Sequence, residues 1–182
     1  MRMGIISSTA LNVVLVNRFQ EKDCTTGCQM INYKAIARNA MILNKNGILK
    51  QFDLVVYPVQ LVIAIGNLEK EINRFYKPYD EQYNHIGFPG DNPAATYQVR
   101  NKKTNDVACL IWIPKTDDVR GSYLAHESGH VTLEVFKYVG AHVDYDDQEP
   151  FCYLLGTIFR LCNNAFYHWK DFVEKDDKTK KK

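Results

Sequence analysis

The sequence predicts an α+β domain in which a small, mostly antiparallel sheet packs on two consecutive long helices. Short apolar runs bounded by turn signals occupy the middle of the chain, as is typical of strands. After residue 120, apolar residues recur at helical spacing instead. With 182 residues and 46% apolar content, the chain is long enough to bury one core.

Residues 1–40 fit this pattern poorly. They include a β-like stretch at residues 11–16, a polar turn at 23–27 and an expected short helix at 31–41. None of these has an evident packing partner in the rest of the sequence. We therefore expect an appended N-terminal segment, with the main domain covering residues 41–173.

Three or four strands are expected before the first long helix. Asn44-Lys45-Asn46-Gly47 is a turn of hairpin type. A strand is then expected over residues 52–57, ending or bulging at Pro58. A second apolar run covers residues 59–65 and is closed by Gly66.

A short helix and a long loop separate these strands from a second hairpin. Asn67 is expected to cap a helix over residues 68–76. Residues 79–93 are polar and rich in Gly and Pro, and are long enough to form the rim of a cleft or to be disordered. Strands over residues 95–100 and 107–113 then form the hairpin.

Two helices complete the predicted domain. The first covers residues 121–139 and ends before Gly140. The second begins near Gln148, where acidic residues and a proline favour a first helical turn, and runs to about Phe172. Residues 174–182 are rich in lysine and predict a charged, disordered tail.

The first long helix carries H-E-x-x-H, formed by His126, Glu127 and His130. Positions four apart share one helix face, so the two imidazoles can bind one Zn²⁺ at about 2.0–2.1 Å. Glu127 then lies beside a metal-activated water and can accept its proton. Two ordinary helix histidines are the alternative, but the amphipathic helix and the buried strand before it favour a metal site.

A catalytic zinc normally has three protein ligands, so a third residue is required. Glu149 is the expected ligand, because the second helix would bring it to the histidines by folding back on the first. The alternative is that Glu149 only caps its helix, since Asp146-x-x-Glu149 imitates a capping box. His142, Asp144, Asp146 and Cys152 are the competing ligands, and His142 is the strongest of them.

This arrangement resembles the gluzincin metallopeptidases, in which H-E-x-x-H is followed by a glutamate ligand on the next helix. The resemblance implies a zincin-like fold, a bound Zn²⁺ and peptide-bond hydrolysis with Glu127 as general base. The chain departs from thermolysin-like enzymes, because Gln148 and Tyr153 stand where those enzymes have Asn and Asp. Metzincins fit less well, because Leu133 and Phe136 stand where they have Gly and His.

The segment Glu149-Pro150-Phe151-Cys152-Tyr153-Leu154-Leu155-Gly156 also looks like the small zincin-like proteins of tailed bacteriophages and prophages. Tyr153 shares a helix face with Glu149, and its hydroxyl could contact a ligand or a developing oxyanion. We therefore expect Tyr153 to act beside Glu127, with a half-buried core tyrosine as the alternative. Tyr123 has a weaker claim, and Gly156 is expected at a close contact between helices.

Charge and cysteine content bear on partners and location. A net charge of +2 predicts no strong electrostatic partner, so we expect a peptide or protein substrate and no nucleic acid. No apolar run reaches the roughly 18 residues of a membrane span. Five cysteines, including Cys24 and Cys28, show no disulfide spacing and favour a reducing compartment. We expect a cytoplasmic protein, in the host cytoplasm if phage-encoded.

Two other function classes remain open from the sequence. One is a catalytically inactive, zinc-stabilised protein-interaction module, which would keep the metal ligands but would tolerate the loss of Glu127. The other is an α+β binding domain without a metal. Because Glu127 is present, the sequence favours the enzyme.

Overall fold

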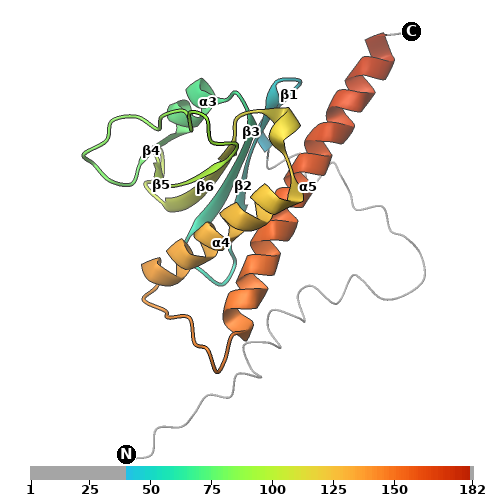
Figure 1. Cartoon of the computed structure of the whole chain (residues 1–182). Coiled ribbons are helices and arrows are strands. Elements are labelled where there is room, and N and C mark those ends of the chain that lie inside the picture. The colour runs from blue at the N-terminus through green and yellow to red at the C-terminus, as the bar shows by residue number, and fades with distance from the viewer. Residues whose placement is uncertain (1–39, 181–182) are drawn as a thin grey trace, which may run out of the picture. The chain divides into compact units, whose positions relative to one another are not determined.

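The computed structural model describes residues 40–180, which form a six-stranded sheet and three α-helices (Figure 1). The strands follow the order β1-β2-β3-β6-β5-β4 across the sheet. Neighbouring strands are antiparallel, except that β3 and β6 run parallel. The expected α+β class with a mostly antiparallel sheet is therefore confirmed. The strands are Ala40–Asn44 (β1), Gly47–Asp53 (β2), Gln60–Gly66 (β3), Tyr76–Pro78 (β4), Ala95–Asn101 (β5) and Val107–Ile113 (β6), and the helices are Glu69–Phe75 (α3), Gly121–Tyr138 (α4) and Glu149–Lys180 (α5).

The predicted hairpin turn after Asn44 joins β1 to β2, as expected. The Asn44 side chain accepts a hydrogen bond from the Asn46 backbone N–H at 2.8 Å. Gly47 has φ +156°, and a Cβ atom there would lie 2.0 Å from the Ile65 carbonyl oxygen of β3. Only glycine allows this close approach between β2 and β3.

The strand predicted over residues 52–57 is wrong beyond Asp53, where β2 ends. The chain turns there, and the Tyr57 N–H donates to the Leu54 carbonyl at 2.7 Å. Because Asp53 pairs with Gln60 of antiparallel β3, the intervening residues must reverse direction. The segment is apolar and β-branched, which is typical of a strand. It nevertheless forms a turn, in which Val55 is 72% exposed.

The two faces of the sheet are covered by different helices (Figure 1). Ile63 and its neighbours on one face pack with side chains of α4 and α5. Val62 and Ala64 point the other way and pack with Ile72 of α3. This alternation follows from the two-residue period of a strand. The helix predicted over residues 68–76 is confirmed, although Leu68 rather than Asn67 is its N-cap and makes no side-chain cap bond.

Helix α5 continues to Lys180, past the end predicted at Phe172 and through most of the segment predicted to be a disordered tail. Asp171 and Lys175 are four residues apart and solvent-exposed, with the acid N-terminal to the base. Opposite charges at this spacing favour an exposed helix by about 0.2–0.5 kcal/mol. No helix within residues 40–180 combines the length and apolar character needed to cross a membrane.

The expectations for residues 1–39 fall outside the described residues, including the pair Cys24 and Cys28. At the boundary, Ala40 and Met41 lie in β1 rather than at the end of a helix. Ala40 pairs with Lys50 of β2, so the sheet already begins at this residue.

Candidate metal centre

Helix α4 positions the H-E-x-x-H motif, and its span agrees closely with the predicted residues 121–139. One side of the helix is buried against the sheet and α5, with Val131 and Val135 at its centre. Two buried hydroxyls on this side bond back to the helix, from Ser128 to the Leu124 carbonyl at 2.6 Å and from Thr132 to the Ser128 carbonyl at 2.7 Å. These polar groups are satisfied internally, so the helix can bury them without an unpaired donor.

His126 and His130 extend from α4 on successive turns and meet. Their Nε2 atoms are 3.1 Å apart, and the rings are nearly perpendicular at 79°. Two nitrogens that each lie about 2.05 Å from one tetrahedral zinc would be about 3.3 Å apart. The distance between the two Nε2 atoms is therefore close to that expected for two ligands of one Zn²⁺.

Glu127 is the buried member of the motif, with 6% of its surface exposed. Its carboxylate accepts a hydrogen bond from the Thr96 hydroxyl of β5 at 2.6 Å. A buried carboxylate needs such a donor, because desolvation of an unpartnered charge is costly. The bond orients the Glu127 carboxylate, and Glu127 lines the same cavity as the two histidines.

A cavity of about 370 Å³ joins these three residues to β5. Gln98 lies two residues after Thr96 on β5, and its side-chain amide donates to the Glu134 carboxylate of α4. The cavity is lined by Asn92, Ala94, Ala95, Thr96, Gln98, His126, Glu127, His130 and Glu134. Thr96, Gln98 and Glu134 were not predicted as site residues from the sequence. Glu134 could have been predicted, because it stands four residues after His130 and therefore on the same face of the helix.

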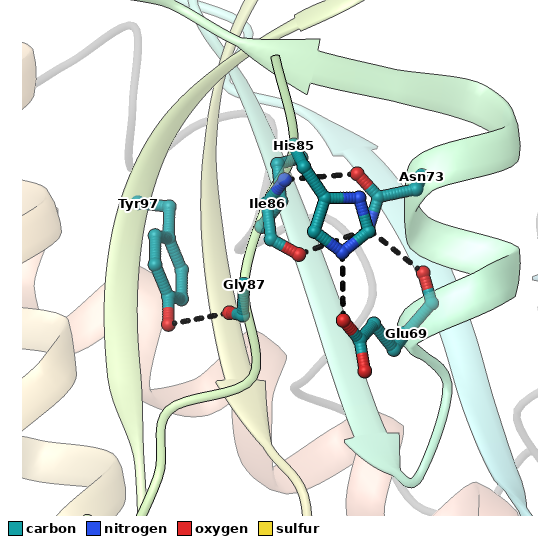
Figure 2. A network of polar contacts seen from close by, with 6 residues as sticks. All are labelled: Glu69, Asn73, His85, Ile86, Gly87 and Tyr97. Atoms are coloured by element: carbon teal, nitrogen blue, oxygen red, sulfur yellow. Dashed lines mark hydrogen bonds and ion pairs between the residues drawn. The ribbon is translucent and has the colours of Figure 1, made fainter. Parts of the chain in front are cut away.

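The loop predicted as a cleft rim is ordered and is tied to α3 (Figure 2). The Asn73 side chain donates to the Ile86 carbonyl and accepts from the Ile86 N–H, both at 2.9 Å. His85 contacts Glu69 at 2.7 Å, and the Tyr97 hydroxyl donates to the Gly87 carbonyl at 3.1 Å. These contacts hold the loop beside β5, so that Asn92 reaches the cavity. Burial raises the pKa of Tyr97, and the charges of Glu127 and Glu69 add to this effect.

The expected third ligand is not brought to the histidines in this structure. Glu149 is the first residue of α5, is solvent-exposed and does not line the cavity. The competing ligands His142, Asp144, Asp146 and Cys152 are exposed as well. Within residues 40–180, no three His, Cys, Asp or Glu side chains are grouped so that they could hold a metal ion. The assignment of Glu149 as a ligand therefore stays a prediction.

The predicted accessory residues also lie outside the cavity. Tyr153 is 43% exposed, and Tyr123 packs against the core with Arg120 over its ring at 5.9 Å. The expectation that Gly156 marks a close helix contact is wrong, because a Cβ atom there would meet nothing within 4 Å. Helix α5 approaches α4 through larger side chains instead, among them Cys162, and burial raises the pKa of the Cys162 thiol to about 12.

Comparison with known protein families, with curated proteins and with solved structures finds no match to this chain. A function must therefore be argued from the geometry and chemistry of the site.

Proposed function

We propose that this chain is a zinc-dependent metallopeptidase with a zincin-like arrangement of the gluzincin type. One observation carries the proposal: the paired imidazoles of His126 and His130 and the buried carboxylate of Glu127 share one cavity along β5. Together they supply two nitrogen ligands and a base, which metal-assisted hydrolysis of a peptide bond requires.

His126 and His130 would hold the zinc ion, with Glu149 as the proposed third ligand. Glu149 would have to approach from the start of α5, which directly follows the exposed loop at residues 139–148. When bound, the metal would lower the pKa of a water molecule to about 7 and polarise the substrate carbonyl.

Glu127 would carry the proton transfers. Its carboxylate accepts one proton from water as the water oxygen bonds to the scissile carbonyl carbon. The same proton then passes to the leaving nitrogen as the peptide C–N bond breaks, which yields a carboxylic acid and an amine. The remaining proton of the acid then passes to the amine, which leaves a carboxylate and an ammonium group. The Thr96 hydroxyl keeps the Glu127 side chain oriented through both transfers.

The proposal is tested by Glu127→Gln together with His126→Ala. General acid–base assistance contributes about 10²–10⁴-fold, so Glu127→Gln should reduce cleavage of a peptide library at least about a hundredfold. Zinc content should be unchanged in Glu127→Gln, because the ligands are intact, whereas His126→Ala should lose zinc and cleavage together. Glu174→Gln is the matched control for Glu127→Gln, since Glu174 is exposed on α5 and lies outside the cavity.

Two results would count against the proposal. If Glu127→Gln cleaves as fast as wild type, the activity belongs to another site or to a contaminant. If wild type binds zinc tightly and cleaves no member of the library, the chain is better described as a zinc-stabilised interaction module.

A further inference from the structure

The candidate site contains a second carboxylate that the proposed reaction does not use. Glu134 of α4 is half-buried and lines the same cavity as His126 and His130. The Glu134 carboxylate accepts a hydrogen bond from the neutral side-chain amide of Gln98, and this contact does not balance its negative charge. Among the described residues that line the cavity, none is Lys or Arg.

Glu134 stands one helical turn beyond the histidine pair on α4. The helix rises about 1.5 Å per residue, so Glu134 lies roughly 6 Å along the axis from His130 and roughly 12 Å from His126. Within residues 40–180, Glu134 belongs to no group of three side chains that could hold a metal ion, so it is not counted as a ligand. The position suits contact with substrate beside the scissile bond.

The spacing of Thr96 and Gln98 along β5 follows the spacing of Glu127 and Glu134 along α4. Thr96 contacts Glu127, and two residues later Gln98 contacts Glu134. Two residues of extended chain span roughly 6.8 Å. An extended peptide lying along β5 with its scissile bond at Glu127 would place a side chain one or two residues away beside Glu134.

From this placement we propose that Glu134 selects substrates carrying Lys or Arg within two residues of the scissile bond. The inference rests on the proposed metallopeptidase function and adds its substrate class. A carboxylate can accept about four hydrogen bonds, and Gln98 donates to Glu134 once in this structure. The ammonium group of a substrate Lys or the guanidinium group of a substrate Arg donates further hydrogen bonds to the Glu134 carboxylate and balances its negative charge.

The test uses the zinc-loaded full chain and a library of internally quenched peptides. The peptides have Lys, Arg, Gln or Glu at each position near the scissile bond. Wild type should favour Lys or Arg at one position within two residues of the cleaved bond. A charge-assisted hydrogen bond contributes about 1.5–3 kcal/mol, so Glu134→Gln should reduce the Lys-over-Gln ratio of kcat/KM at that position by about tenfold or more.

Charge reversal and a matched control sharpen the test. Glu134→Lys should shift the preference at that position toward Glu. Glu174→Gln makes the same change on an exposed part of α5, and it should keep the wild-type ratio. Zinc content is measured in parallel, and Glu134→Gln should keep it.

Four results overturn the inference, and they are distinguishable. Cleavage without a basic preference, or a preference that survives in Glu134→Gln, removes the role of Glu134 but leaves the metallopeptidase intact. Loss of zinc in Glu134→Gln makes Glu134 a metal ligand instead. If the zinc-loaded wild type cleaves no peptide, the proposed function fails, and the substrate class fails with it.

Discussion

At the scale of single residues, the hydrogen bond between Thr96 and Glu127 links the sheet to the motif. Thr96→Val keeps the shape of the side chain and removes the donor. A hydrogen bond to a charged group contributes about 1.5–3 kcal/mol, so we expect kcat to fall by about tenfold or more. Zinc content should not change, because Thr96 is not a ligand. The measurements are steady-state kinetics and metal analysis of the purified variant.

The matched control for this prediction is Thr157→Val on α5, since Thr157 does not line the cavity. It should cleave at the wild-type rate. Equal activity of Thr96→Val and wild type would show that the Thr96 hydroxyl does not position Glu127 during the reaction.

A second prediction at this scale concerns the third zinc ligand. If Glu149 binds the metal, Glu149→Gln should lower zinc affinity by more than about a hundredfold, since even changes next to ligands cost about 10–100-fold. His142→Ala should have little effect. Both affinities are measured by competition with a chelator. The reverse order would assign the ligand to His142.

At the scale of elements, the local patterns predicted α4 and the β5–β6 hairpin closely. Helical apolar spacing identifies α4 because one side of that helix faces the core. The contacts of Glu127 with Thr96 and of Glu134 with Gln98 could not be predicted, because they join segments about 30 residues apart or more. Such contacts depend on strand order and register, which side-chain spacing within one segment does not encode.

The failed predictions have a similar cause. Residues 52–57 have strand-like composition, yet the pairing of β2 with β3 turns the chain at Asp53. Gly156 looked like a contact between helices, yet it lies on an exposed side of α5. Composition alone does not distinguish a close contact from an exposed position, because the neighbouring element decides which one forms.

The exposed position of Gly156 leads to a stability prediction. Gly156 lies inside α5, and a Cβ atom there would meet nothing within 4 Å. Gly156→Ala should therefore stabilise the fold by about 0.5–1 kcal/mol, because glycine loses more backbone entropy in a helix. For a domain of this size that corresponds to a rise in Tm of about 1–4 °C. Differential scanning calorimetry measures the change.

Gly47→Ala provides the contrast. Its Cβ atom would lie 2.0 Å from the Ile65 carbonyl oxygen, so Tm should fall strongly. If Gly156→Ala instead lowered Tm, Gly156 would not be exposed as described. A close contact between helices at Gly156, as the sequence predicts, would then be supported.

At the scale of the whole molecule, the candidate site and the elements that support it lie within residues 40–180. The cavity is lined by residues between Asn92 and Glu134. Strand β1 is the edge strand at the opposite end of the sheet from β5 and β4. It also contacts α5, because the Trp169 indole N–H donates to the Asn44 carbonyl at 3.1 Å. The site therefore depends on a sheet that starts at Ala40.

This organisation predicts how truncation affects the protein. A chain that begins at Lys34 should bind the same amount of zinc as the full chain. It should also melt within about 4 °C of the full chain, which corresponds to roughly 1 kcal/mol for this size. A chain that begins at Gly47 lacks β1 and the Asn44 carbonyl, so it should melt at a clearly lower temperature. A large loss of stability on removal of residues 1–33 alone would place that segment in the core, and the domain boundary near residue 40 would then be wrong.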